Sequence, residues 1–263
     1  MKRSTQVLLS LLLGCASCGC SGIPDAAKLD AEGKAFAAKV VDEQKSHWDA
    51  EALQKNFPAS SISVTDLRNL VQKYSEGLGE PTSTTAFDGS YRVNAGINVP
   101  DYVGEYKAEL TCTKGKGTVN VSVVHKNGKW YLANFNVVSA DLAPKDKELQ
   151  SFVDDVADKI SCNWRIEDLN YYGSELFKKQ LKESELPMKA MFAGAKALGP
   201  FKSVKSSKFL GIGQYQGAET FSYELTSVFE RGEASLMITV LKEETKWKLA
   251  GFHVQAHSGT RKS

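Results

Sequence analysis

The sequence predicts an α+β protein in which one unit, helices followed by a curved antiparallel sheet, occurs twice in tandem. The four tryptophans form two pairs at nearly equal separations, Trp48 with Trp164 and Trp130 with Trp247. In each half, apolar residues recur first at helical spacing and later at every second position, as in a half-buried strand. Each half has about 110 residues, a common size for a domain with its own core.

The matched segments follow the same order in both halves. The longest match is the last strand, where KWYLANFNV at 129–137 recurs as KWKLAGFHV at 246–254. The join between the halves is short and contains Pro144, so we expect the two units to touch. The predicted boundaries are a signal peptide at 1–14, a tether at 15–29, a first unit at 30–142 and a second unit at 143–258.

Each unit is expected to begin with a helix, because apolar residues recur there every four positions. The stripe is complete in the second unit and is interrupted at Gln44 in the first. Its members are Phe36, Val40 and Trp48 in the first unit, and Phe152, Val156, Ile160 and Trp164 in the second. A short helical segment follows in each unit, at residues 50–57 and 166–177.

A third helix is expected to begin at Thr65, a suitable N-cap residue, and to end at Gly77 and Gly79. Its apolar residues lie on one face at helical spacing. The matching helix of the second unit contains Leu186 and ends near Gly199.

The spacing of apolar residues then changes to two, which predicts strands that are buried on one face. The alternating sets are Tyr106, Ala108, Leu110 and Cys112; Val119, Val121 and Val123; and Phe221, Tyr223, Leu225 and Ser227. Glu109 and Glu224 occupy alternate positions, so we expect both to face away from the core. Asn127-Gly128 predicts a two-residue hairpin turn before Trp130.

The N-terminus has the pattern of an exported lipoprotein. A short positive segment precedes an apolar run at 7–13, which is too short to span a bilayer and suits a signal peptide. Leu12-Leu13-Gly14-Cys15 resembles the lipobox of bacterial lipoproteins, which implies that Cys15 carries the lipid and becomes the first residue. Cys18 and Cys20 are the alternative lipidation sites, and an ordinary signal peptide is the alternative to a lipobox.

Two further cysteines, Cys112 and Cys162, lie in the globular part of the chain. A disulfide between them is permitted outside the cytoplasm. They fall in different predicted units, however, and two separate thiols are the alternative interpretation.

The order of helices and strands resembles the cystatin-like, NTF2-like family, in which helices pack into the concave face of a bent antiparallel sheet. The strand 119–125 followed by Gly128-Lys129-Trp130-Tyr131-Leu132 is typical of secreted bacterial members, and several of these are lipoprotein domains of unknown function. The resemblance covers residues 30–256 as two copies. It implies two cones but no particular reaction, because this fold hosts isomerases, dehydratases and interaction modules.

If the last strand lines the cone, each unit has a pocket with a tryptophan wall and one polar tip. The expected pocket-lining residues are Trp130, Leu132 and Asn136 in the first unit, and Trp247, Leu249 and His253 in the second. A solvent-exposed strand end is the alternative interpretation. Because the polar tips differ between the units, two identical catalytic sites are not expected.

The sequence contains no pattern typical of a catalytic, cofactor-binding or metal-binding site. His253 and His257 are four residues apart, which on a strand is about 13 Å, and no third zinc ligand is visible. His47 and His125 lie beside a predicted helix end and a predicted turn, so we expect both at the surface.

Three functional hypotheses follow. The first is a non-enzymatic binding module, held on a membrane of the cell envelope by its lipid, that binds an envelope protein or a small ligand. The second is an isomerase or dehydratase that uses His253 as a base, which requires His253 to be buried. The third is a structural protein that forms a homodimer through its sheets. The net charge of +2 gives no field that would select nucleic acid.

Overall fold

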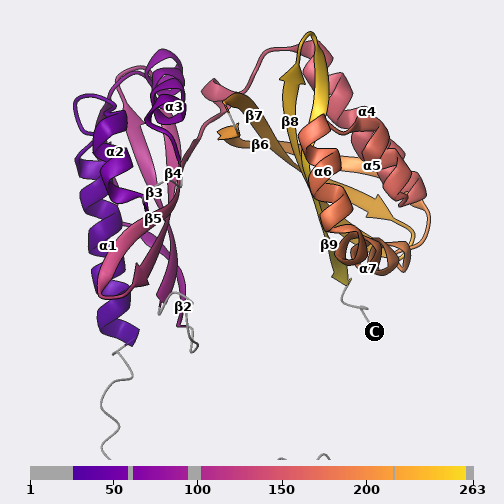
Figure 1. Ribbon diagram of the computed structural model, residues 1–263, viewed down its shortest axis with the longest axis horizontal. Coiled ribbons are helices and arrows are strands. Elements are labelled where there is room, and N and C mark those ends of the chain that lie inside the picture. Colours follow the sequence, from indigo (N-terminus) through magenta and orange to yellow (C-terminus); the bar gives the residue numbers. More distant parts are fainter. Residues whose placement is uncertain (1–25, 59–61, 94–101, 216, 259–263) are drawn as a thin grey trace, which may run out of the picture.

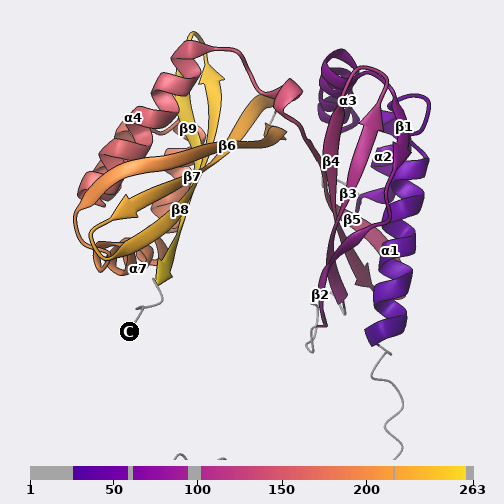
Figure 2. The ribbon, with the colours of Figure 1, turned by 180° about the vertical axis from the view of Figure 1, so that it is seen from behind.

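The chain folds as an α+β protein with two antiparallel sheets, each covered by helices on one face (Figure 1). A computed structural model describes residues 26–58, 62–93, 102–215 and 217–258. In both views of the ribbon the helices lie on the outer sides, and the uncovered faces of the two sheets are turned toward each other (Figure 1 and Figure 2).

The N-terminal sheet has five strands and follows three helices. The helices are α1 (Ala26–Asp42), α2 (Ala50–Asn56) and α3 (Val64–Leu78). The strands are β1 (Pro81–Thr84), β2 (Asp88–Val93), β3 (Tyr102–Cys112), β4 (Lys116–Lys126) and β5 (Lys129–Val138). Both β1 and β2 pair with β3, and β4 and β5 extend the sheet on its other side. The strand β5 is therefore an edge of this sheet.

The C-terminal sheet has four strands in sequence order and follows four helices. A short 3-10 turn, η1 (Ala140–Leu142), leads into the helices α4 (Lys147–Asn163), α5 (Ile166–Tyr172), α6 (Glu175–Glu183) and α7 (Glu185–Lys196). The strands are β6 (Phe201–Tyr215), β7 (Ala218–Phe229), β8 (Gly232–Glu243) and β9 (Lys246–Ser258). The strands β6 and β9 are its edges.

Three expected helix boundaries are wrong. The helix α1 begins at Ala26, inside the predicted tether 15–29, because Leu29 is buried in the core. The N-cap of α3 is Ser63 rather than Thr65, since the Ser63 hydroxyl accepts a hydrogen bond from the Asp66 amide at 3.0 Å. The segment 166–177 is divided between α5 and α6, where the Ser174 hydroxyl caps the second helix.

The first helical stripe is confirmed only in part, because α1 ends at Asp42 and Trp48 lies beyond it. The Trp48 indole instead donates a hydrogen bond to the Gly79 carbonyl at 2.9 Å, beside the end of α3. In the second half, Trp164 directly follows α4 and caps it with a left-handed backbone, φ 50°. Trp48 and Trp164, which match in sequence, therefore have different roles: Trp48 binds beside the end of α3, and Trp164 caps α4.

The alternation predicted for the strands is confirmed. Both predicted sets, on β3 and on β7, are buried. Glu109, which lies between the buried residues Ala108 and Leu110 of β3, is exposed. Asn127 and Gly128 form the two-residue turn between β4 and β5, with φ of 53° and 73°. Such positive φ values at both positions match the twist of the flanking strands.

Each sheet contains a β-bulge in its last strand that the sequence does not reveal. In β5, Ser122 pairs with Asn134 while Val123 pairs with Leu132, so Ala133 is an extra residue. In β9 the same irregularity leaves Ala250 as the extra residue. An extra residue reverses the two-residue alternation, because every later side chain changes to the other face.

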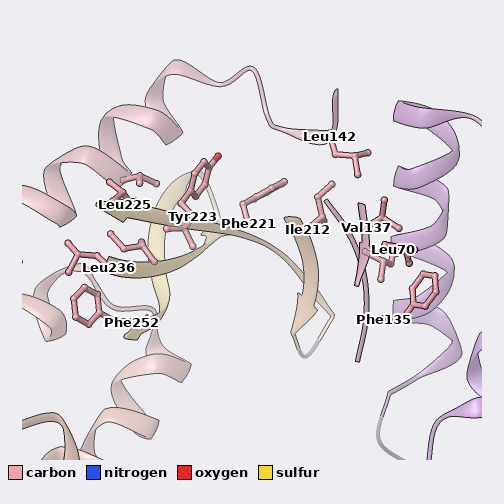
Figure 3. Packing of buried hydrophobic residues seen from close by; sticks show 14 of the residues in the cluster. Leu70, Phe135, Val137, Leu142, Ile212, Phe221, Tyr223, Leu225, Leu236 and Phe252 are labelled. Atoms are coloured by element: carbon pink, nitrogen blue, oxygen red, sulfur yellow. The ribbon is translucent and has the colours of Figure 1, made fainter. Parts of the chain in front are cut away.

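The two sheets meet where the edge strands β5 and β6 approach each other. Figure 3 shows Ile212 of β6 at this junction, near the first-half residues Leu70 and Phe135. These three residues line a common cavity, and Ile212 is only 6% exposed. Lys73 of α3 also forms a 3.5 Å ion pair with Glu219 of β7. Apolar burial and a partly exposed ion pair therefore contribute to the junction between the two halves.

Candidate binding cleft between the sheets

The uncovered face of the N-terminal sheet is polar across three neighbouring strands. We define this polar face as Lys107 and Glu109 of β3, Thr118, Asn120 and Ser122 of β4, and Asn134 and Asn136 of β5. Asn120 lies opposite both Lys107 and Asn136, and Ser122 lies opposite Asn134. Directly opposed residues have Cβ atoms about 5 Å apart, so the three asparagines form one group.

A cavity of about 650 Å³ lies between the polar face and Lys208 and Leu210 of β6. It shares Asn134, Asn136 and Leu210 with a second cavity of about 420 Å³, which extends to Met237 on β8. We call these cavities together the inter-sheet cleft. Side chains from both sheets form its walls, and apolar residues of α3, Leu67 and Leu70, join them in the smaller cavity.

The cleft extends in the opposite direction along the same face. A further cavity of about 430 Å³ shares Asp88, Lys107 and Asn120 with the largest one and reaches Ser90 of β2. The hollow surface is therefore elongated, and it runs across β2, β3, β4 and β5 before reaching the second sheet.

Asn136 connects the two halves at the wall of the cleft. Its side-chain amide donates to the Leu210 carbonyl at 3.1 Å and accepts from the Tyr74 hydroxyl at 3.3 Å. The same hydroxyl accepts from the Val137 amide at 3.1 Å, and burial raises the pKa of Tyr74 well above its usual range. Tyr74 stays protonated and can hold both partners.

Gly211 allows this contact, and we expect Gly211→Ala to weaken it. Gly211 has φ of 134°, and a Cβ there would lie 2.6 Å from the Asn136 amide nitrogen. We expect a loss of about 1–3 kcal/mol in unfolding free energy from this strain, measured by urea denaturation. Gly194→Ala is the control, because no atom lies within 4 Å and alanine in a helix adds about 0.5–1 kcal/mol. Equal stability of the Gly211 variant and the parent would contradict this role.

The expected cone-lining set is wrong in its geometry, because the two bulges separate its members. Leu132 and Leu249 are buried toward the helices as expected. Asn136 and His253 follow the bulges and project from the opposite face of their sheets. Asn136 does line a cavity, but this cavity is the inter-sheet cleft rather than the interior of a cone.

The two expected tryptophan walls are half-buried packing residues. Trp130 stacks on Phe36 with ring centroids 6.3 Å apart and meets Tyr102 edge-on at 5.4 Å. Trp247 meets Phe221 edge-on at 5.7 Å and lies under the Lys242 ammonium. Both rings pack against the hydrophobic core.

The histidines do not come together. His253 and His47 are exposed, His125 lies against Trp130, and His257 shares a 2.9 Å hydrogen bond with Ser235. Within the described ranges, no group of three or more His, Cys, Asp or Glu residues could hold a metal ion. The isomerase hypothesis requires a buried His253, and this expectation is wrong because His253 is exposed.

A buried tyrosine–aspartate network in the N-terminal half was missed by the sequence analysis. The Tyr102 and Tyr106 hydroxyls contact each other and both donate to one Asp30 oxygen, at 3.0 and 2.8 Å. The Lys34 ammonium lies 2.9 Å from the other Asp30 oxygen. Burial raises the pKa of Tyr106 to about 12, so its hydroxyl remains a donor. The four-residue spacing of the tyrosines on one strand face was the available signal.

The two globular cysteines are free thiols in different surroundings. Cys112 is buried on β3, where burial raises its pKa to about 11, and Cys162 is exposed. Two separate thiols, rather than a disulfide, are what the structure contains. The proposed lipidation sites Cys15, Cys18 and Cys20 lie outside the described residues.

Comparison with solved structures finds a remote similarity to a cystatin-like protein. No protein-family model and no curated protein matches the sequence. A crystal structure of a cystatin-like protein from Ruminococcus gnavus is similar at 7% identity and a TM-score of 0.28, over 74% of each chain. A TM-score this low does not establish a shared fold. In the part of the chain that the structure describes, no helix is long and apolar enough to cross a membrane.

Proposed function

We propose that this protein is a lipoprotein of the cell envelope that binds a ligand without transforming it, in the inter-sheet cleft. In this proposal the chain consists of two NTF2-like units in tandem, and a lipid on Cys15 holds it on a membrane. The observation that carries the binding function is the wall of amides and hydroxyls that the polar face contributes to the cleft.

The side chains of the cleft favour binding over catalysis. Asn120 and Asn134 each offer a carbonyl acceptor and two amide donors. Asn136 keeps one amide hydrogen beyond its bonds to Leu210 and Tyr74. Primary amides do not change protonation in the physiological range, unlike the histidine that general acid–base catalysis uses most often. The walls can therefore hold and orient a polar ligand.

Self-association through the sheets remains the second candidate. The edge strand β6 carries Lys202, Lys205 and Lys208, all exposed. Lysine on an edge strand discourages pairing with another chain. This favours the binding module, and light scattering after size-exclusion chromatography would decide between a monomer and a dimer.

Ligand binding can be tested by native mass spectrometry of the protein purified from its own membranes. We expect a non-covalent adduct on the parent that is lost in Asn134→Arg, because Asn134 is exposed and a large cation there would fill the cleft. Asn170→Arg is the matched control and should keep the adduct, because it places the same change on an exposed position of α5. An adduct that survives in Asn134→Arg, or a turnover abolished by it, would overturn the proposal.

The lipid anchor predicts a sharp change in location. In Cys15→Ser the acceptor thiol is absent, so the protein should move from the membrane fraction to the soluble fraction. Several acyl chains bind a membrane stably, whereas none are left in this variant. Mass spectrometry of the N-terminal peptide gives the lipidated residue directly. Cys18→Ser is the matched control, and loss of the anchor only in that variant would move the site to Cys18.

A further inference from the structure

We infer that the inter-sheet cleft takes an uncharged glycan chain. This inference rests on the proposed binding function and names the class of ligand. Three properties of the cleft lead to it: a nearly balanced charge, amides that both donate and accept, and an elongated shape.

The charges of the largest cavity cancel. Its walls contain two acidic residues, Asp88 and Glu109, and two basic ones, Lys107 and Lys208. The cavity that extends it toward β2 adds one more acidic residue, Glu105, so the whole cleft has three acidic and two basic residues. A site for nucleic acid or another polyanion needs an excess of Lys and Arg, which supplies most of the affinity. A site for a polycation needs the reverse. Walls whose charges nearly cancel suit a ligand without net charge.

The remaining polar groups match hydroxyls. The asparagines at 120, 134 and 136, together with Thr118 and Ser122, combine donors and acceptors within one patch. A sugar hydroxyl also donates one hydrogen bond and accepts others, so each can be satisfied by a neighbouring amide. A ligand without such groups would leave the amides unpaired on binding, which is costly.

The shape favours a chain over a small molecule. The three cavities overlap through shared residues and reach from Ser90 on β2 to Met237 on β8. One common way to recognise an extended peptide uses the open edge of a sheet, with pockets for alternate side chains. Here the ligand would lie across the pleated face, where side chains rather than backbone groups point outward. Glycan is therefore favoured over peptide.

The test is calorimetric titration of the full-length lipoprotein in a detergent that contains no sugar. The probes are two uncharged hexasaccharides, the β-1,4-linked N-acetylglucosamine hexamer and maltohexaose. We expect saturable binding of at least one, weakened at least about tenfold in the double variant Asn120→Ala/Asn134→Ala, which removes several hydrogen bonds. Asn170→Ala, an exposed amide on α5, should bind like the parent.

Salt dependence provides a second readout, which separates a neutral ligand from a charged one. Because the ligand is neutral, raising the salt from about 50 mM to about 500 mM should change the parent affinity less than about twofold. Failure of both hexasaccharides to bind, or binding of a blocked Gly-Ser hexapeptide in their place, would overturn the glycan assignment. A membrane-derived adduct lost in Asn134→Arg would then still support the binding function, so the two failures are distinguishable.

Discussion

Replacement of Asp30 by alanine is expected to lower the unfolding free energy by about 3 kcal/mol, because hydrogen bonds to a charged group are worth about 1.5–3 kcal/mol each. The Asp30 carboxylate accepts from Tyr102 and Tyr106 and pairs with Lys34. Both tyrosine rings are almost fully buried, at 0% and 2% exposure. Without the carboxylate, their hydroxyls lose their shared acceptor in the core.

The control for Asp30 lies on the same helix. Glu32 pairs with Lys28 at 3.9 Å, and both side chains are largely exposed. Surface pairs of this kind contribute about 0–1 kcal/mol, so Glu32→Gln should leave the urea midpoint nearly unchanged. Similar losses in the two variants would show that the network adds nothing beyond a surface charge pair.

The same network predicts a dependence of stability on pH. Burial by itself would raise the pKa of Asp30, but the hydrogen bonds from Lys34, Tyr106 and Tyr102 outweigh it and lower the pKa below 3.8. The stabilisation is therefore present above pH 3.8 and is lost as the pH falls through the lowered value. In Asp30→Asn, which has no carboxyl group to protonate, this part of the loss of unfolding free energy at acidic pH should disappear. Urea titrations at neutral and acidic pH measure it.

Local patterns predicted most elements of the fold. The alternation from Tyr106 to Cys112 and the Asn127-Gly128 turn were sufficient to place the strands β3 to β5, because strand burial and turn geometry depend on neighbouring residues. Helix limits were less predictable. Ser63 and Thr65 are both good cap residues, and tertiary contacts decide which one is used.

The site could not be predicted because it depends on two features that leave no recognisable pattern in the sequence. An extra residue at Ala133 turns Asn134 and Asn136 to the uncovered face, yet the surrounding letters read as an unbroken strand. The opposite wall comes from Lys208 and Leu210, about 70 residues later. Both depend on how the sheets pack, which periodicity within one strand does not encode.

The uncovered faces of the two sheets also differ in a way that the sequence match hides. At the centre of the C-terminal face, Met237 is 46% exposed, and Ser222 and Thr239 satisfy each other at 3.0 Å. The N-terminal face presents Asn120 and Asn134 instead. In our proposal the N-terminal half therefore supplies the hydrogen-bonding wall, and the C-terminal half supplies the second wall and its apolar end.

The bulge in β9 can be tested by a pair of neighbouring substitutions with opposite expected outcomes. An unbroken alternation from Trp247 would bury His253 and expose Phe252, whereas the extra residue Ala250 reverses this. Phe252 is 8% exposed and meets Phe192 edge-on with ring centroids 5.9 Å apart, and His253 is exposed. The two positions therefore report directly on the phase of the strand.

We expect Phe252→Ala to reduce the unfolding free energy by about 3–5 kcal/mol, because it removes a buried aromatic ring and leaves a cavity against Phe192. His253→Ala should change the unfolding free energy by less than about 0.5 kcal/mol, as is usual for a surface position. Urea denaturation followed by circular dichroism measures both values in one series. If His253→Ala proved the more damaging change, the strand would follow the unbroken alternation, and a base within a second cone would again become a tenable hypothesis.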